Sequence, residues 1–250
     1  MSGAAQTTSQ QTRSTWQVIQ GGKTVDPLDL LAGIGTTITL PRDRELHAQG
    51  DGAEFCYRIV SGSVRTVKLM EDGRRQIGAF LFAGDCLGFD ALDTHDFAAQ
   101  AASDVVLRRY RRREVEAMME RHASLARGLR EMAARELRGA YDRILLLGRK
   151  TASERIATFL LEMAARQPGG RARGCSAGSL GGSVGGSLAG CRVPLPMSRC
   201  DIADHLGLTV ETVCRMMTRL GREGTIVIEP GQVELRNKAV LQQMAAEARH

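Results

Sequence analysis

Four side chains that can contact nucleobases lie at helical spacing near the C-terminal end of the chain: Glu211, Cys214, Arg215 and Arg219. An arginine can donate two hydrogen bonds to guanine in the major groove, and a carboxylate can accept one from the cytosine amino group. Such contacts distinguish base pairs, whereas contacts to phosphates do not. The segment therefore predicts a helix that binds double-stranded DNA through these residues: Thr209, Glu211, Thr212, Cys214, Arg215 and Arg219.

Two helices and a tight turn are predicted to hold these side chains in place. Ser198 is a candidate N-cap for the first helix, Gly207 supplies the positive φ that ends it, and Thr209 is a candidate cap for the second. Two β-prone runs, residues 225–228 and 233–235, follow and flank a Glu-Pro-Gly-Gln turn. This pattern predicts a winged helix-turn-helix, with these apolar residues facing inward: Ile202, Ala203, Leu206, Val210, Val213, Met217 and Leu220.

The same two helices allow a second interpretation, an amphipathic hairpin with a solvated charged face, which is the commoner structure. The β-hairpin that follows favours DNA binding, because it completes the winged arrangement. The net charge of the chain is +6, but the basic excess lies in residues 108–173 and not on the predicted recognition helix. The charge therefore agrees with an acidic partner without requiring one.

The segment also resembles a known family. Glu211, Cys214 and Arg215 fall in the pattern E-x-x-S-R of the Crp/Fnr superfamily recognition helix, inside the run IADHLGLTVETVCRMMTRL, and the match is strongest to the FixK and Fnr branches. The resemblance implies a homodimeric bacterial transcription regulator, in most cases an activator that contacts RNA polymerase. It also implies that the glutamate and the arginine contact a TTGAT-type half-site and that position 214 lies near a thymine. This chain has cysteine at that position, where the family has serine.

Short β-prone runs separated by glycines precede the helices, which predicts an antiparallel roll or barrel. The runs FCYRIVSGSVRTVKL and GAFLFAGDCLG resemble the β-roll of cyclic nucleotide-binding proteins. We assign residues 28–112 to a sensor-like β-roll and residues 1–27 to a flexible N-terminal tail. The predicted fold class is α+β, with an N-terminal β-roll, a long dimerisation helix and a C-terminal winged helix-turn-helix. Strands are expected at Phe55–Val60, Ser63–Leu69, Gln76–Phe82 and Val105–Arg109.

Residues 113–150 predict a helical connector, with a short helix at 113–122 and a long one at 125–150. Apolar residues of the long helix are spaced alternately by four and three, which suits pairing with a second helix. Such a stripe is also common in intramolecular cores. A protein that binds inverted repeats must place two recognition helices about one DNA turn apart, which a two-fold helix pair provides. The family resemblance likewise assigns dimerisation to this helix, through Leu129, Ala133, Leu137, Ala140, Ile144 and Leu147.

Residues 151–250 are assigned to the DNA-binding domain. It should begin with a helix over 151–166, capped by Thr151 or Ser153, with Ile156, Phe159, Leu160 and Met163 facing inward. A glycine- and serine-rich insertion, residues 168–191, has too few large side chains to form a core and is interpreted as a linker. A phosphate-binding loop is disfavoured, because the insertion contains neither G-x-x-x-x-G-K-[ST] nor any lysine.

Composition places the protein among ordinary globular chains, with 43% hydrophobic and 25% charged residues over 250 positions. Residues 1–20 contain a single charged side chain and no secretory apolar core, and no apolar run approaches the roughly 18 residues of a membrane span. We therefore expect a cytoplasmic protein without a membrane partner. The six cysteines include no C-x-x-C pair and are expected to be mostly free thiols.

The sequence predicts no resident cofactor in the roll. No lysine or arginine occurs in residues 76–107, and Phe89 stands where nucleotide-binding members of the resembled family have a ribose-binding glutamate. A buried phosphate without a cation is costly, so cyclic nucleotide binding is disfavoured unless Arg65 or Arg138 reaches in from outside. An Fnr-type iron-sulfur cluster is disfavoured because the first cysteine is Cys56, far from the N-terminus.

Histidines leave one alternative for the roll, an effector-dependent Crp-like regulator that binds haem or another small ligand. His47 and His95 lie there, although single histidines more often have structural roles. His47, His95 and His122 are scattered and no H-x-H occurs, so we predict no metal site, no catalytic residues and no enzyme. A receptor that does not bind DNA would leave residues 198–236 without a role.

Cys214 is a candidate redox site. Its thiol lies on the base-facing side of the predicted recognition helix, next to Arg215. Oxidation there would add bulk and charge inside the DNA groove. Glu211, one turn earlier, opposes thiolate formation. The alternative is that cysteine replaces serine only as a small side chain against a thymine methyl group.

Overall fold

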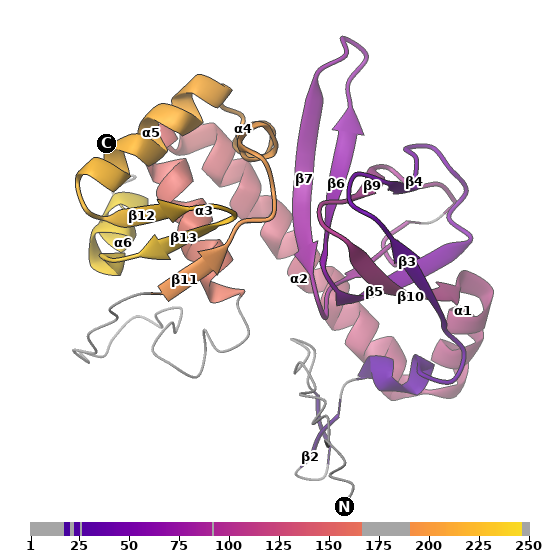
Figure 1. The fold of residues 1–250 in the computed structure, drawn as a ribbon. Coiled ribbons are helices and arrows are strands. Elements are labelled where there is room, and N and C mark those ends of the chain that lie inside the picture. The colour runs from indigo at the N-terminus through magenta and orange to yellow at the C-terminus, as the bar shows by residue number, and fades with distance from the viewer. Residues whose placement is uncertain (1–17, 21–22, 26, 92, 167–190, 247–250) are drawn as a thin grey trace, which may run out of the picture.

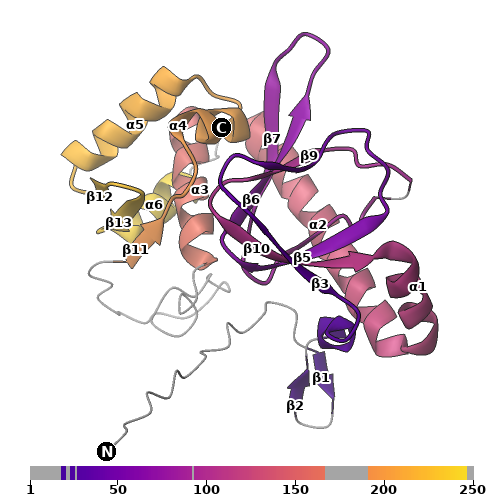
Figure 2. The same cartoon turned by 45° about the vertical axis from the view of Figure 1, so that its right-hand side comes forward.

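The computed structural model describes residues 18–20, 23–25, 27–91, 93–166 and 191–246. A β-roll and a smaller domain of helices with a three-stranded sheet lie side by side, and the long helix α2 (Ala123–Arg149) runs beneath both (Figures 1 and 2). This arrangement confirms the predicted α+β class. Within the described ranges, no helix is long and apolar enough to cross a membrane.

Two four-stranded antiparallel sheets form the roll, in the orders β3-β10-β5-β8 and β4-β9-β6-β7. The four predicted strands coincide with β5, β6, β7 and β10 to within two residues, whereas β4, β8 and β9 are too short for a period-two pattern to reveal. The bounds are β3 (Thr36–Leu40), β4 (Glu45–His47), β5 (Phe55–Ser61), β6 (Ser63–Leu69), β7 (Arg75–Phe82), β8 (Cys86–Leu87), β9 (Ala98–Ala101) and β10 (Val105–Arg111).

Gly62, between β5 and β6, shows why glycine punctuates the roll. Its φ is +83°, a left-handed value that other residues adopt only with strain. A Cβ atom there would also lie 2.1 Å from the backbone oxygen of Asp104. Glycine is therefore required at this hairpin for both conformation and space.

The first half of α2 packs against the roll. Part of the predicted dimer seam must therefore be corrected. This half of α2 is covered by α1 (Arg112–Arg121) and the 3-10 helix η1 (Pro27–Leu31). Leu129, which we placed in the seam, is only 9% exposed and lies in an intramolecular cluster with Leu125 and Met132. Leu147, at the other end of the predicted seam, is partly buried against the DNA-binding domain. Leu129 therefore belongs to the core of a single chain, whereas the place of Leu147 in the seam remains a prediction.

The outer face of α2 carries large apolar side chains that the described part of the chain leaves exposed. Leu137 and Ile144 belong to the predicted seam, as do Ala133 and Ala140, which are also exposed. Tyr141 and Leu145 fall outside the alternating spacing and were not predicted. The four large side chains on this face form what we call the exposed α2 stripe. They are Leu137, Tyr141, Ile144 and Leu145, with exposed fractions of 56, 59, 66 and 60%.

The C-terminal domain begins with α3 (Ala152–Ala165). Thr151 caps it in a complete capping box with Glu154, and the four predicted inward residues are all buried. The helices α4 (Arg199–Leu206), α5 (Val210–Arg222) and α6 (Lys238–Ala246) follow. The sheet has the order β11-β13-β12, with β11 (Cys191–Pro194), β12 (Ile226–Glu229) and β13 (Gln232–Leu235).

Two predicted boundaries need correction. Cys191, the last residue of the predicted insertion, begins β11, because it pairs with Leu235 of the wing. In the predicted flexible tail, residues 1–27, a short antiparallel hairpin joins β1 (Val18–Gln20) and β2 (Lys23–Val25), and Pro27 begins η1. Residues 1–17 and 167–190 lie outside the described part, so the flexibility predicted for them remains a prediction.

Candidate nucleic-acid interface

Helix α5 presents the predicted base-contacting side chains on its outer face. The Thr209 hydroxyl accepts a hydrogen bond from the Thr212 N–H at 3.2 Å, which confirms the predicted cap. On the inner face, Val213, Met217 and Leu220 are at most 3% exposed, and Val210 is partly buried on the same core. Exposed side chains line the other face, together with the half-buried Thr212: Thr209, Glu211, Cys214, Arg215 and Arg219.

Local contacts act on two of these side chains. The backbone N–H of Glu211, followed by the Thr209 hydroxyl, holds the pKa of the Glu211 carboxyl below its usual range. The carboxylate is therefore ionised at neutral pH and acts only as an acceptor. Arg219 donates through Nε to Glu223 Oε1 at 2.7 Å, a pair that the sequence analysis missed although its i, i+4 spacing was visible. The pair uses only Nε, so the two terminal nitrogens of the Arg219 guanidinium keep their donors.

The caps of α4 and the turn of the wing are built as predicted. Ser198 and Asp201 form a capping box at the start of α4, with the Asp201 N–H donating to Ser198 Oγ at 3.0 Å. Gly207 ends α4 at φ +60°. Gly231, at φ +70°, turns the chain between β12 and β13. The predicted wing is therefore confirmed, and β11 adds a third strand to it.

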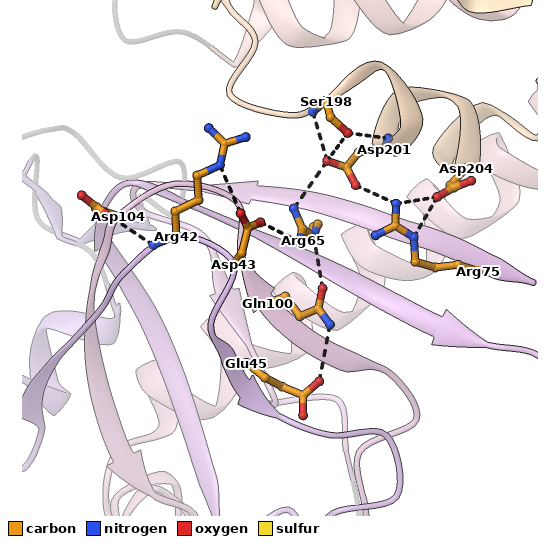
Figure 3. Close-up of polar contacts among 10 residues, drawn as sticks. All are labelled: Arg42, Asp43, Glu45, Arg65, Arg75, Gln100, Asp104, Ser198, Asp201 and Asp204. Atoms are coloured by element: carbon orange, nitrogen blue, oxygen red, sulfur yellow. Dashed lines mark hydrogen bonds and ion pairs between the residues drawn. The ribbon is translucent and has the colours of Figure 1, made fainter. Parts of the chain in front are cut away.

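A cluster of ion pairs, which we call the interdomain cluster, joins α4 to the roll (Figure 3). Asp201 of α4 accepts from Arg65 Nη1 of β6 at 3.4 Å and from Arg75 Nη2 of β7 at 2.9 Å. Arg75 Nε also donates to Asp204 Oδ2 at 2.8 Å. The Asp201 side chain is 4% exposed and that of Arg65 is 9% exposed, so this pair is shielded from solvent. The Ser198 hydrogen bonds and then the two arginines hold the pKa of Asp201 below its usual range against the opposing effect of burial.

Asp43 completes the cluster from the roll. It accepts from Arg65 Nη2 at 2.9 Å, while Arg65 Nε donates to Gln100 Oε1 at 3.2 Å. Asp43 has φ +63°, and among the described residues it is the only one other than glycine with a positive φ. Aspartate tolerates this conformation better than most residues do, at some cost in energy. Arg65 is thus surrounded by acceptors and is not available as the outside phosphate donor considered from the sequence.

His205 links the same helix to both other parts of the molecule. Arg143 of α2 lies with Nη2 at 2.8 Å from His205 Nε2, and the Ile77 carbonyl of β7 lies 3.3 Å from His205 Nδ1. Arginine can only donate, so a ring nitrogen beside it must accept and the ring is neutral. Arg143 Nη1 also lies 3.2 Å from His205 Nδ1 and donates to the His205 carbonyl at 3.0 Å. The Phe80 ring packs against the His205 ring, with 4.9 Å between the two ring centroids. Burial, followed by the Arg143 charge, lowers the pKa of His205 to about 3.

This buried histidine predicts acid sensitivity of the folded protein. Because the pKa in the folded state lies below the unfolded value of 6.5, the unfolded chain takes up a proton first. The contribution is fully present above pH 6.5 and is lost as the pH falls toward 3. At pH 5.5 the loss amounts to about 1.4 kcal/mol. Thermal or urea unfolding between pH 7.5 and 5.5 measures it, and His205→Gln should flatten the pH slope by that amount. Equal slopes for parent and variant would contradict the assignment.

Arg155 bridges the hinge between α2 and the DNA-binding domain. Its guanidinium donates to the Leu147 carbonyl near the end of α2 at 2.8 Å and to the Leu206 carbonyl at the end of α4 at 2.9 Å. A cation at the carbonyl end of a helix satisfies groups that lack intrahelical partners. Lys150 adds a bond to Thr158 Oγ1 at 2.8 Å. The hinge is therefore cross-linked by side chains from both domains.

The segment of the roll that follows Gly84 is acidic. Asp85 is partly balanced by Arg166, the residue after the end of α3, with Nη1 at 3.2 Å from Oδ2. Glu136 of α2 lies at the surface, yet desolvation by the surrounding protein and the charges of Asp90 and Asp85 raise its pKa to about 7. Phe89 packs partly buried on the cluster beneath. The carboxylates of this segment thus lie beside two arginines, Arg166 at Asp85 and Arg112, whose guanidinium donates to the Gly88 carbonyl.

The two roll histidines, which look isolated in the sequence, stack on one another. The ring centroids of His47 and His95 are 3.6 Å apart, with 17° between the ring planes. Burial, followed by the charge of His95, lowers the pKa of His47 to about 4. Both rings therefore have packing partners. Within the described residues, however, the two ring nitrogens of His47 are buried without a hydrogen-bond partner, so stacking alone does not satisfy this side chain. Among the described residues, no group of three or more histidine, cysteine, aspartate or glutamate side chains is placed to hold a metal ion.

Comparison with known proteins agrees with this architecture. A family model described as the Crp-like helix-turn-helix domain matches residues 154–244, and one described as the cyclic nucleotide-binding domain matches residues 37–122. The nitrogen fixation regulation protein FixK of Azorhizobium caulinodans is 38% identical, over 92% of this chain and 88% of that protein. The transcriptional activatory protein AadR of Rhodopseudomonas palustris is 36% identical, over 76% of this chain and 73% of that protein.

A solved structure has the same fold throughout. FixK2 from Bradyrhizobium japonicum superposes with a TM-score of 0.74 and is 40% identical, covering 86% of this chain and all of that one. The likeness thus spans the roll, the long helix and the helix-turn-helix together. With relatives this similar over most of its length, the chain belongs to the Crp/Fnr family of DNA-binding transcription regulators, as its recognition helix indicates.

Proposed function

We propose that the protein binds a two-fold TTGAT-type inverted repeat as a homodimer. The observation that carries the proposal is the outer face of α5, where Glu211, Cys214 and Arg215 lie exposed on a helix whose inner face is fully packed. The exposed α2 stripe supports the dimer, because four large apolar side chains on one helix face are open to solvent in the single chain. Two paired α2 helices would carry two α5 helices to successive turns of the major groove.

The regulator acts without a cyclic nucleotide or an iron-sulfur cluster in this proposal. The segment after Gly84 contains no lysine or arginine up to residue 107. Arg112, which lies beside it, is bonded to the Gly88 and Ala53 carbonyls, and Arg65 is bound within the interdomain cluster. An uncompensated phosphate there would be costly. An effector-dependent regulator with a small ligand in the roll is the second candidate. It predicts that DNA affinity of the purified protein rises on addition of a cell extract's small-molecule fraction.

At promoters, we assign the protein the role of an activator that contacts RNA polymerase and catalyses no reaction. The support is its similarity to AadR, whose name describes a transcriptional activatory protein. Because its partner is genomic DNA, we place its action in the bacterial cytoplasm.

The experiment that tests this function is fluorescence anisotropy of the reduced protein on a TTGAT/ATCAA inverted repeat and on a scrambled duplex. Salt must be held fixed, since phosphate contacts make affinity strongly salt-dependent. We expect tight binding to the repeat and binding at least about a thousandfold weaker to the scrambled duplex, without added effector. Equal weak binding to both would reject the half-site or the effector-free mode.

Oxidation of Cys214 is expected to weaken DNA binding. The thiol is exposed on the outer face of α5, and a sulfenic or sulfinic group there adds volume and polarity beside Arg215. We expect peroxide to lower the affinity for the repeat by at least about tenfold. Cys214→Ser should bind normally and resist peroxide.

A matched control is Cys200→Ser. Cys200 is the other exposed cysteine among those described, on α4, so this variant should keep the sensitivity of the parent. Equal loss of binding in all three proteins would exclude Cys214 as the switch and leave it a small replacement for serine.

A further inference from the structure

The DNA-binding domain shares one hydrophobic core with the roll. Ile77 and Phe80 of β7 are buried in the same cluster as Phe159 of α3 and Leu206 of α4. The rings of Phe80 and Phe159 meet edge to face at 6.3 Å between centroids. Domains joined by small polar interfaces usually move relative to one another, but a continuous apolar contact restrains them. The DNA-binding domain therefore packs on the roll along β7, and this contact restrains motion between the two.

Apolar contact alone leaves the docked orientation poorly defined, because it is not directional. The interdomain cluster beside this core is directional. Charge-assisted hydrogen bonds from arginine to carboxylate require a narrow geometry, and here Arg65 and Arg75 reach the two oxygens of Asp201 separately. Burying such a pair adds little net stability, because desolvation offsets the attraction. Its main effect is then on orientation.

The arginines hold α4 at two points of its first two turns. Asp201 is both the capping-box residue of α4 and the acceptor from the roll, so the start of the helix and its docking depend on one carboxylate. Three residues later, Asp204 accepts from Arg75. Two anchor points on one face fix the rotation of α4 about its axis. Since α5 is packed on α4, its outer face is fixed relative to the roll and to α2.

We propose that Arg65 and Arg75 are positioning residues for DNA recognition, which set the spacing and rotation of the half-sites that the dimer accepts. They do so by anchoring α4 at Asp201 and Asp204 (Figure 3). The inference rests on the proposed function, because spacing has meaning only for a dimer on an inverted repeat. A merely stabilising contact would change affinity for all duplexes alike, whereas a positioning contact changes the preference among spacers.

Binding to repeats with altered spacers tests this directly. Two inserted base pairs rotate one half-site by about 70° relative to the other. We expect the parent to prefer the original spacer by at least about tenfold. Arg75→Glu places a third carboxylate beside Asp201 and Asp204, and should reduce that preference by about fivefold or more. Adding Asp204→Arg restores opposite charges across the contact and should recover most of the preference.

Arg74→Glu is the matched control. Arg74 is one residue away and carries the same charge, but it is 77% exposed and bonds Asp72 within the β6–β7 turn at 2.7 Å. Arg75→Gln is measured as a milder variant, and circular dichroism melts establish that each protein is folded. The Arg74 variant should keep the spacer preference of the parent.

Each outcome decides the inference. An unchanged spacer preference in folded Arg75→Glu and Arg75→Gln would overturn it, and so would an equal loss of affinity on every spacer. A parent that binds the repeat but ignores the spacer would reject the positioning role alone. A parent that binds no duplex would reject the proposed function itself, and the inference with it.

Discussion

Replacing Arg215 by alanine should abolish most sequence-specific binding while the protein remains folded. The side chain is exposed on the outer face of α5, so its loss leaves no cavity in the core. A bidentate arginine–guanine contact contributes about 1–3 kcal/mol of discrimination, and a dimer has two. We expect affinity for the repeat to fall by at least about a hundredfold. Anisotropy on the repeat and on duplexes substituted at each half-site position measures this.

Arg222→Ala is the control for this variant. Arg222 is an exposed arginine on the last turn of the same helix, outside the predicted contact set. Its loss removes the same charge and should weaken binding modestly and equally on all sequences, as a phosphate contact does. Arg215→Ala should in addition lose the preference at one base pair of each half-site. If both variants weaken binding equally on every duplex, Arg215 does not read a base.

Local signals made the recognition element predictable. Ser198, Thr209 and Gly207 act within one turn of the backbone they cap, so the sequence alone reveals the bounds of α4 and α5. The same holds for the hairpin wing, whose strands are adjacent in sequence. β11 was missed because its partner strand lies beyond two helices and its first residue follows a glycine- and serine-rich tract. A short strand with a distant partner has no periodic signal of its own.

Contacts between distant segments were not predictable. Arg65 and Asp201 are 136 positions apart, and no spacing rule connects a strand arginine to the capping residue of a remote helix. The prediction of the dimer seam on α2 was partly wrong for a different reason. Periodicity shows that a helix face is apolar, but not whether the same chain or another covers it. Leu129 is covered by its own chain, whereas Leu145, outside the predicted spacing, is open to solvent.

Because the structure shows which apolar side chains of α2 are exposed, the strongest test of the dimer is Leu145→Glu. The side chain is 60% exposed in the single chain, so the substitution should leave the monomer fold intact. In a two-fold helix pair it would bury two carboxylates against apolar partners, which is costly. We expect a monomer in sedimentation experiments at micromolar concentration.

Loss of the dimer removes the advantage of binding two linked half-sites, so affinity for the inverted repeat should fall by about 10²–10⁴-fold while affinity for a single half-site changes little. The control is Leu69→Glu, the same change at a leucine that is 58% exposed at the end of β6, on the hairpin that projects away from α2 (Figure 1). It should remain dimeric and bind as the parent does. A Leu145→Glu protein that sediments as a dimer would place the interface elsewhere, because two buried glutamates facing each other would not permit pairing through the exposed α2 stripe.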